Sequence, residues 1–188
     1  RKAYPKGIHL PSRGNRKRNV TEIVEVIEKS GVKTIGHIDA KNFIWPVTRT
    51  EALVDLNIFC KQYLKNFGNY QDAMSTGSTF GFHSLLSFAM NVKLVSPMEV
   101  VNTVIEYWQQ HEKDIDISAV EGFVRQIIGW REYMRGIYWA KMPEYAELNA
   151  LKHQNKIPGW FWTGDTKMNC LHHAITQSLE HAYAHHIQ

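Results

Sequence analysis

The run from Val120 to Trp139 constrains the fold of this chain more than any other segment. Its apolar residues recur at helical spacing, and Ser118 with Glu121 forms a capping-box pattern at its start. A second capping box, Ser96–Glu99 with Pro at the first helical position, predicts a helix to about His111. We therefore expect long helices packed on one another. The buried stripe of the longest one should be Val120, Phe123, Val124, Ile127, Ile128 and Ile137.

Two further helical patterns precede these. The segment Thr21–Lys29 predicts a short helix, whereas Thr34–Asp39 is typical of an irregular or short extended piece. Thr48 or Thr50 should cap a longer helix that reaches residue 66 and stops at Gly68. The spacing of its apolar residues gives an inner face of Leu53, Leu56, Phe59, Tyr63 and Phe67.

The last helical pattern opens at Thr166 and continues to Gln188. The side chains expected on its inner face are Met168, Leu171, Ile175, Leu179 and Ala182. After Trp45 there is no convincing strand pattern, and the chain contains no internal repeat. The sequence therefore predicts an all-α fold.

Composition bounds the class of protein. With 44% hydrophobic residues, the 188-residue chain can bury a sizeable core. No apolar run approaches the roughly 20 residues that span a bilayer, so we expect no membrane partner. Two cysteines cannot build a disulfide framework, which makes a reducing cytoplasm the default location. The chain opens without Met and closes inside a helical pattern, and we expect a monomeric piece of a longer protein.

Positive charge is concentrated at the N-terminal end. No acidic residue precedes Glu22, whereas the basic residues there are Arg1, Lys2, Lys6, Arg13, Arg16, Lys17 and Arg18. A basic segment of this kind, rich in Pro and Gly, can be a phosphate-contacting arm, a solvated linker between domains, or both. We assign residues 1–46 to this arm or linker and residues 47–188 to a helical domain.

A loop rich in Gly, Ser and Thr runs from Asn69 towards a helix that we expect to begin at about His83. Free amides and hydroxyls at a helix N-terminus form an anion site that suits a pyrophosphate. Most loops of this composition bind only water, so the pattern alone leaves both interpretations open.

Three motifs in the expected order point to one family. They are Gln126 with Trp130 and Arg131 in the long helix, the tetrapeptide Met168–Leu171, and the C-terminal Tyr183–Gln188. From about Phe43 onwards the chain resembles the deoxyribodipyrimidine photolyase-related proteins, the bacterial iron–sulfur photolyases and cryptochromes of the six-four type. The resemblance implies a helical FAD-binding domain, with FAD and a four-iron iron–sulfur cluster in the intact protein. It also implies an antenna chromophore on an N-terminal domain absent from this sequence.

The resemblance also implies roles for residues of the loop and of the long helix. Trp130 would stack on the extruded lesion and Gln126 would reach a pyrimidine edge, as extraction of a base from the stack requires. The alternative is that Trp130 is a core aromatic and that Arg131 forms a local ion pair with Glu132. The flavin contacts implied by the family are Tyr70, Ser84, Leu85, Leu86, Ser87, Glu121, Gln126 and Arg131.

Further site residues follow from the resemblance or compete with it. His186 would donate a proton to the lesion with support from His185, because imidazole titrates near neutrality. Trp162 would belong to an electron relay, and Cys170 would be a cluster ligand whose three partner cysteines are absent here. Cys60 is best interpreted as a small core residue. A zinc site made from His181, His185, Cys170 and His173 is a weaker alternative.

These residues predict light-driven, flavin-dependent repair of six-four pyrimidine photoproducts by a DNA photolyase. Damaged DNA would be the partner, and Arg13, Arg16, Lys17 and Arg18 would contact its phosphates. The piece by itself should bind no cofactor and should be inactive. Two alternatives from other classes are a cryptochrome-like blue-light photoreceptor and a helical scaffold that binds nucleic acid without chemistry.

Overall fold

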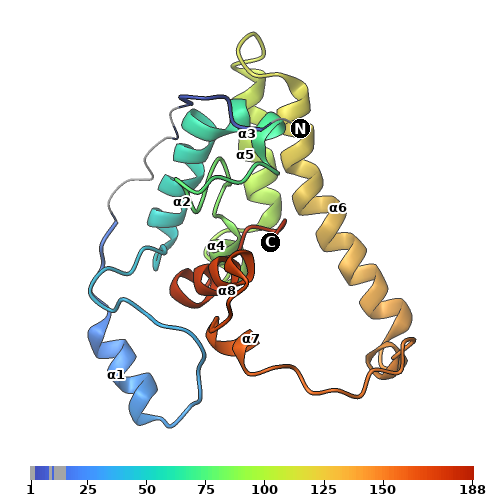
Figure 1. Cartoon of the computed structure of the whole chain (residues 1–188). Coiled ribbons are helices and arrows are strands. Elements are labelled where there is room, and N and C mark those ends of the chain that lie inside the picture. Colours follow the sequence, from blue (N-terminus) through green and yellow to red (C-terminus); the bar gives the residue numbers. More distant parts are fainter. Residues whose placement is uncertain (1–2, 9, 11–15) are drawn as a thin grey trace.

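The computed structural model describes residues 3–8, 10 and 16–188. Across these residues the secondary structure is helical, and no strand forms (Figure 1). Only two isolated antiparallel bridges occur there, between Arg18 and Phe43 and between Ser75 and Ser78. The all-α prediction is confirmed. No helix in this part of the chain combines the length and apolarity that crossing a bilayer requires.

Long connections separate α1 from α2, α3 from α4 and η2 from α7, whereas the other helices follow one another more closely. Their bounds are α1 Thr21–Lys29, α2 Arg49–Ile58, the π-helical η1 Phe59–Tyr63, α3 Leu64–Tyr70, α4 Ser87–Asn91, α5 Pro97–Gln109, α6 Ile117–Lys141, the 3-10 helix η2 Glu144–Glu147, α7 Trp160–Thr163 and α8 Asn169–His181. The bounds of α1 match the prediction.

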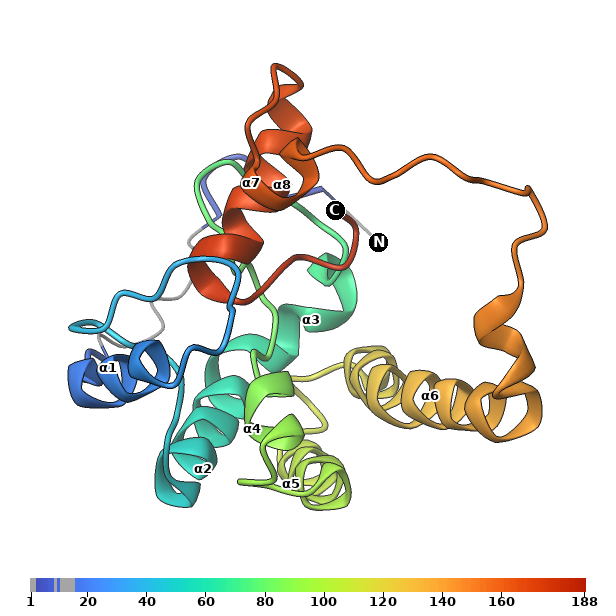
Figure 2. The same cartoon turned by 90° about the horizontal axis from the view of Figure 1, so that it is seen from below.

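The core is built from α2, η1, α3, α4, α5 and the first half of α6, with α3 near the centre of the molecule in Figure 2. Phe59 packs on Phe123 with ring centroids 4.6 Å apart, and Phe67 meets the same ring edge-on at 5.4 Å. Cys60 is buried among these side chains, as predicted, and burial raises the pKa of its thiol to about 12. This aromatic cluster fixes α3 against α6.

Gly68 does not stop a helix. It lies within α3, which continues to Tyr70. A Cβ atom on Gly68 would lie 2.8 Å from the Cα of Ala119, closer than real contacts allow. The glycine is therefore needed for the close approach of α3 to α6, and the prediction of a stop at this position was wrong.

Two of the predicted helix caps are confirmed and one is wrong. Thr48 caps α2 and Ser96 caps α5, each in a complete capping box. For α6 the cap is Asp116, whose carboxylate accepts the N–H of Ser118 at 2.8 Å. The box predicted from Ser118 to Glu121 was wrong, because an acidic residue two positions earlier already satisfies the first free amide.

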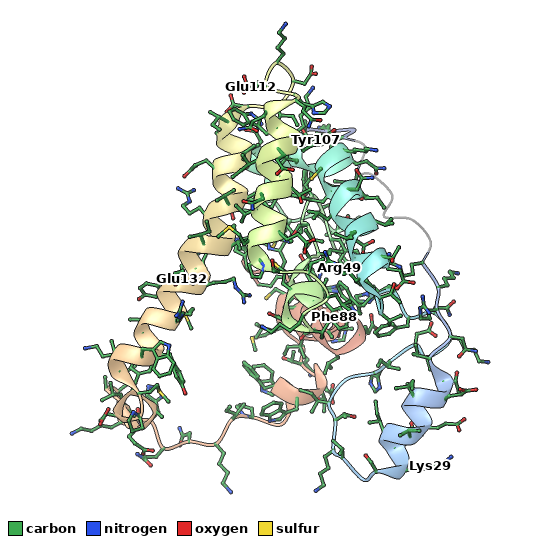
Figure 3. All side chains as sticks on the ribbon, turned by 180° about the vertical axis from the view of Figure 1, so that it is seen from behind. Lys29, Arg49, Phe88, Tyr107, Glu112 and Glu132 are labelled. Atoms are coloured by element: carbon green, nitrogen blue, oxygen red, sulfur yellow. The ribbon has the colours of Figure 1, made fainter. Side chains whose placement is uncertain are left out.

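The two halves of α6 lie in different environments. Val120, Phe123 and Ile127 are buried, as the stripe predicted. Ile128, also assigned to the stripe, is exposed. None of the described helices lies beside the second half of α6, around Glu132, and its side chains extend away from the rest of the molecule (Figure 3). The apolar stripe thus ends halfway along the helix.

The C-terminal helix is shorter than predicted at both ends. It begins at Asn169 instead of Thr166, after the separate short helix α7, and it ends at His181 because Ala182 adopts a left-handed conformation with φ 49°. The backbone N–H of His37 and the indole N–H of Trp45 bind carbonyls of its last turn at 2.8 and 3.0 Å. These donors satisfy groups that a helix end otherwise leaves free. His185 and His186 consequently lie beyond α8.

Two arginines of the N-terminal segment pair with carboxylates of α2. Arg16 forms two hydrogen bonds of 2.8 Å with the carboxylate of Asp55, and Arg18 pairs with Glu51. Lys17 is exposed, and Arg13 lies outside the described residues. The predicted boundary at residue 46 stays a prediction, but many contacts cross it.

Candidate functional site

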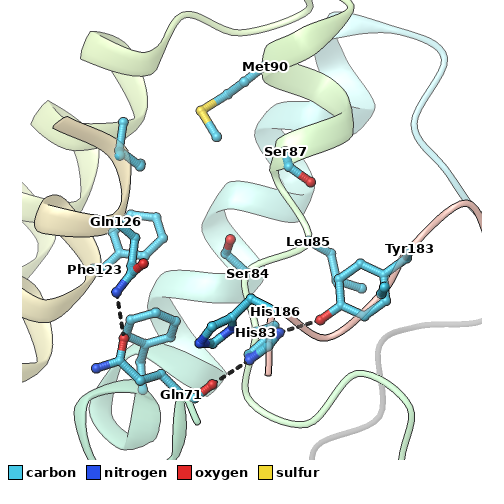
Figure 4. Close-up of a pocket in the computed structure, with 13 residues that line it drawn as sticks. Gln71, His83, Ser84, Leu85, Ser87, Met90, Phe123, Gln126, Tyr183 and His186 are labelled. Carbon is cyan, nitrogen blue, oxygen red and sulfur yellow. Dashed lines mark hydrogen bonds between the residues drawn. The ribbon is translucent and has the colours of Figure 1, made fainter. Parts of the chain in front are cut away.

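A pocket with a cavity volume of about 260 Å³ opens between α3, α4, the first half of α6 and the segment that follows α8 (Figure 4). Small-molecule pockets typically measure about 300–1,000 Å³, so this one suits a single ring system. Its lining residues are Phe67, Gln71, His83, Ser84, Leu85, Ser87, Met90, Phe123, Gln126, Ile127, Tyr183, Ala184 and His186.

One wall of the pocket belongs to the aromatic core. Phe67 and Phe123 line the cavity and pack edge-on against each other, and both belong to the buried cluster. Ile127, one helical turn beyond Phe123 on α6, continues this wall. An apolar wall backed by a close-packed core is suited to hold a flat ring in one orientation.

The opposite wall is the loop from Ser84 to Ser87. Leu85 has a positive φ of 56°, which is rare for a residue with a side chain, and this residue keeps the loop from being helical. The helix therefore begins at Ser87 and not at about His83, as the sequence had suggested. Ser84, Leu85 and Ser87 face the cavity, whereas Leu86 is buried in the core. Uncommon backbone conformations of this kind concentrate at functional sites.

Two side-chain amides meet at one edge of the pocket. Gln126 donates from Nε2 to Oε1 of Gln71 at 3.2 Å, and Gln71 is buried. The backbone carbonyl of Gln71 also accepts a hydrogen bond of 2.6 Å from Nε2 of His83. Gln71 thereby links α6 to the loop before α4, and the amide pair gives the apolar cavity a polar edge.

Three imidazole rings gather at the pocket. The ring of His185 lies 4.3 Å from that of His83 and 5.0 Å from that of His186 between centroids. His186 places its Nε2 2.8 Å from the carboxylate oxygen Oδ1 of Asp72. Of these three histidines, His186 is therefore the one that contacts a carboxylate.

His185 differs from its neighbour because it is buried. Its Nδ1 accepts the N–H of Ile187 at 3.2 Å, so the neutral ring carries its proton on Nε2. That Nε2 is buried without a hydrogen bond of good geometry. Burial lowers the pKa of His185, as does the neighbouring His186, while the nearby backbone of Ala73 and the carboxylate of Asp72 oppose the shift.

Nitrogen atoms of His83, His185 and His186 lie within 4.8 Å of one another, close enough to be considered as metal ligands. Both nitrogens of His83 are already hydrogen-bonded, one to Tyr183 and one to Gln71. A metal would have to displace the hydroxyl of Tyr183. The group also contains neither Cys170 nor His181 of the zinc site considered from the sequence. We therefore interpret it as a hydrogen-bonded cluster.

Comparison with known proteins identifies relatives of the chain. It is 43% identical over 167 residues to a (6-4) photolyase of Agrobacterium fabrum, an alignment that covers 89% of this chain and 32% of that protein. The chain belongs to the photolyase-related family. It is also 30% identical over 112 residues to uncharacterized protein R853 of Acanthamoeba polyphaga mimivirus, covering 60% of this chain and 84% of that protein. No family model matches the chain.

Within this photolyase-related chain, the pocket brings together several of the predicted site residues. Ser84, Leu85, Ser87, Gln126 and His186 all line it, and they come from four separate parts of the structure. His185 lies directly behind His186. The chain spans about a third of the length of the photolyase that it matches.

Other predicted residues lie away from the cavity. Tyr70 packs on Phe82, with ring centroids 5.6 Å apart. Glu121 is exposed and forms a 3.1 Å ion pair with Arg125 on the next turn. Arg131 is exposed without lining the pocket.

Three predicted residues lie on parts of the chain that are exposed. Trp130 lies one turn beyond Gln126 on α6, with its ring edge-on to Tyr133. Trp162 lies on α7, and Cys170 is an exposed free thiol in the first turn of α8. None of the three reaches the lining of the pocket.

Four residues of the site were not predicted as functional. They are Gln71, Asp72, His83 and Tyr183. Each acts on a partner distant in sequence: 114 positions separate Asp72 from His186, and 100 separate His83 from Tyr183. A polar residue on a loop gives no local signal of such a partner.

Proposed function

We propose that the chain forms part of a photolyase that repairs six-four pyrimidine photoproducts in DNA with light and a flavin. The observation that supports this most directly is the 2.8 Å contact of His186 with the carboxylate of Asp72, located at a pocket that also presents the amide of Gln126. A proton donor, a group able to bind a pyrimidine edge and an apolar wall are what such a reaction needs in one place.

The lining of the pocket fits the ring system of FAD. Phe67, Phe123 and Ile127 offer apolar surface to a flat ring, while the hydroxyls of Ser84 and Ser87 face the same cavity. FAD, when bound, supplies the electron that light drives onto the lesion. At about 260 Å³ the cavity is too small for a whole dinucleotide. Arg131, Glu121 and Tyr70 stay predicted flavin contacts, and they would serve the parts of FAD outside the cavity.

His186 is the residue that we propose to move the proton. Its Nε2 donates a hydrogen bond to the carboxylate of Asp72, and this contact keeps the ring at the pocket. After the lesion has gained an electron, the proton passes from His186 to the lesion. The proton returns to the His186 ring when repair is complete. His185, whose pKa burial lowers, stacks on this ring and supports it.

The remaining roles extend beyond the pocket. Trp130 would stack on the extruded lesion, and the exposed Trp162 would relay electrons towards the flavin. Cys170 would be one ligand of a four-iron cluster whose other ligands are not in this sequence. Duplex DNA would contact the basic N-terminal segment.

The test is the replacement His186→Asn in the intact protein that contains this chain, with His173→Asn as the matched control because His173 is exposed on α8. Removing the proton donor should lower the repair yield about 10²- to 10⁴-fold. Flavin content, photoreduction and affinity for lesion DNA should stay at wild-type levels. The control should repair normally.

Other outcomes separate the alternatives. Wild-type repair by His186→Asn would assign the proton to another group. An intact protein that binds and reduces flavin but repairs no lesion in wild-type form would be a photoreceptor. Binding of nucleic acid without flavin would indicate the non-catalytic scaffold.

A further inference from the structure

We propose that His83 is a positioning residue that holds His186 at the pocket by fixing the segment Tyr183–His186. The inference rests on the proposed function, because it assigns a role to the support of the proton donor. His83 comes from the loop before α4, far in sequence from the segment that it would hold.

Hydrogen bonding determines the state of the His83 ring. Its Nε2 lies 2.6 Å from the backbone carbonyl oxygen of Gln71, which can only accept, so Nε2 carries the proton. In the neutral ring Nδ1 has no proton and accepts the hydroxyl of Tyr183 (Figure 4). Both nitrogens are therefore occupied by protein groups. His83 orients its neighbours and has no nitrogen left for a substrate.

The segment after α8 needs such support. Ala182 ends the helix, and residues 183–188 belong to no helix or strand. The segment makes one short backbone bond within itself, from Gln188 N to His185 O at 2.9 Å. Side chains connect it to the rest of the molecule instead, through Tyr183 to His83 and through His186 to Asp72.

The ring of His83 also contacts the segment by its face. Its centroid lies 4.3 Å from that of His185 and 5.6 Å from that of His186. Tyr183 is further enclosed by Phe80, whose ring meets it edge-on at 5.4 Å. His83 thus contacts three residues of the segment, Tyr183, His185 and His186, and its bond to Gln71 ties them to the wall that carries Gln126.

Three substitutions in the intact protein separate these contacts. His83→Phe keeps a flat ring but loses both hydrogen bonds, and Tyr183→Phe loses only the hydroxyl. His83→Asn keeps an acceptor near the position of Nδ1. The matched control is His111→Phe, because His111 is also hydrogen-bonded to a backbone carbonyl, at 2.7 Å from Tyr107, but lies outside the pocket.

The expected result is a loss of repair yield without a loss of binding. His83→Phe and Tyr183→Phe should each lower the repair yield at saturating lesion DNA by on the order of 10- to 100-fold, the cost of misplacing a reactive group by about 1 Å. Flavin content and the Kd for lesion DNA should not change. His83→Asn should recover part of the yield, and His111→Phe should match wild type.

The inference fails if Tyr183→Phe repairs at the wild-type yield, a result that decides the matter even if His83→Phe does not fold. It also fails if yield, flavin content and DNA affinity fall together, since that pattern indicates a general loss of structure. The proposed function has a separate test, because His186→Asn must lower the repair yield about 10²- to 10⁴-fold whatever the His83 variants do.

Discussion

Arg16 holds the carboxylate of Asp55 through two hydrogen bonds of 2.8 Å, one from each terminal nitrogen of its guanidinium group. The neighbouring Lys17 is exposed. Two adjacent cations of the basic segment therefore have different environments. Arg16 connects the segment to α2, whereas Lys17 is the one placed to meet a polyanion.

Substitution should separate these two roles. Lys17→Gln should weaken duplex binding regardless of lesion and reduce the salt slope of binding by about 1. Arg16→Gln should leave that slope unchanged and lower the free energy of unfolding by roughly 1–3 kcal/mol, since it leaves Asp55 without its partner. Binding titrations at several salt concentrations and urea unfolding measure the two effects. Equal salt slopes in wild type and Lys17→Gln would make the segment only a linker.

The contact of Gly68 with Ala119 predicts a clear stability difference between two glycines. Gly68→Ala should destabilise the fold by about 1–3 kcal/mol, because the new methyl group would lie 2.8 Å from the Cα of Ala119. Gly136→Ala is the control, since a Cβ at Gly136 meets nothing within 4 Å and alanine favours the helix. It should stabilise the protein by about 0.4–1 kcal/mol. Chemical unfolding of both variants checks the pair, and a harmless Gly68→Ala would contradict the close packing of α3 on α6.

The cap of α6 can be tested at two nearby positions. Asp116→Ala should cost about 0.5–2 kcal/mol, because it removes the acceptor of the Ser118 N–H. Ser118→Ala should change stability by less than about 0.5 kcal/mol. Thermal unfolding compares the two variants. If Ser118→Ala destabilised the protein more than Asp116→Ala, the result would support the capping box from Ser118 to Glu121.

The burial of His185 predicts a pH dependence of stability. Burial lowers its pKa in the folded protein, so between that pKa and the ordinary value of about 6.5 the unfolded chain binds more protons than the folded one. The contribution is therefore fully present above about pH 6.5 and is lost as the pH falls towards the folded pKa. His185→Phe should flatten this part of the profile, as measured by urea unfolding between neutral pH and about pH 5. An unchanged slope in the variant would assign the acid sensitivity to other groups.

Local signals in the sequence predicted the parts of the fold that local interactions determine. The short helix at residues 21–29 and the capping box at Ser96 each depend on neighbours within a few positions, and both are found. The end of α8 could not be read in this way. Alanine is no usual helix stop, and Ala182 ends the helix where His37 and Trp45 take over carbonyls of its last turn.

The residues of the candidate site also fall into a group that the sequence identified and a group that it did not. Ser84, Leu85, Ser87, Gln126 and His186 belong to motifs that the resemblance identified, and the fold gathers them at one cavity. Their supports, Gln71, Asp72 and His83, became visible only when the fold brought them into contact with partners 55 to 114 positions away. Sequence patterns identified groups suited to the chemistry, whereas the geometry identified the groups that hold them.

The bonds from His37 and Trp45 to the end of α8 affect where the chain can be shortened. A truncation at residue 47 would follow the predicted domain boundary and remove both donors, along with the pairing of Arg16 with Asp55. The carbonyls of Leu179 and His181 would then depend on water alone, immediately before the segment that carries Tyr183 and His186. The smallest piece that preserves the pocket should therefore begin before Arg16, although every residue lining the cavity lies after residue 66.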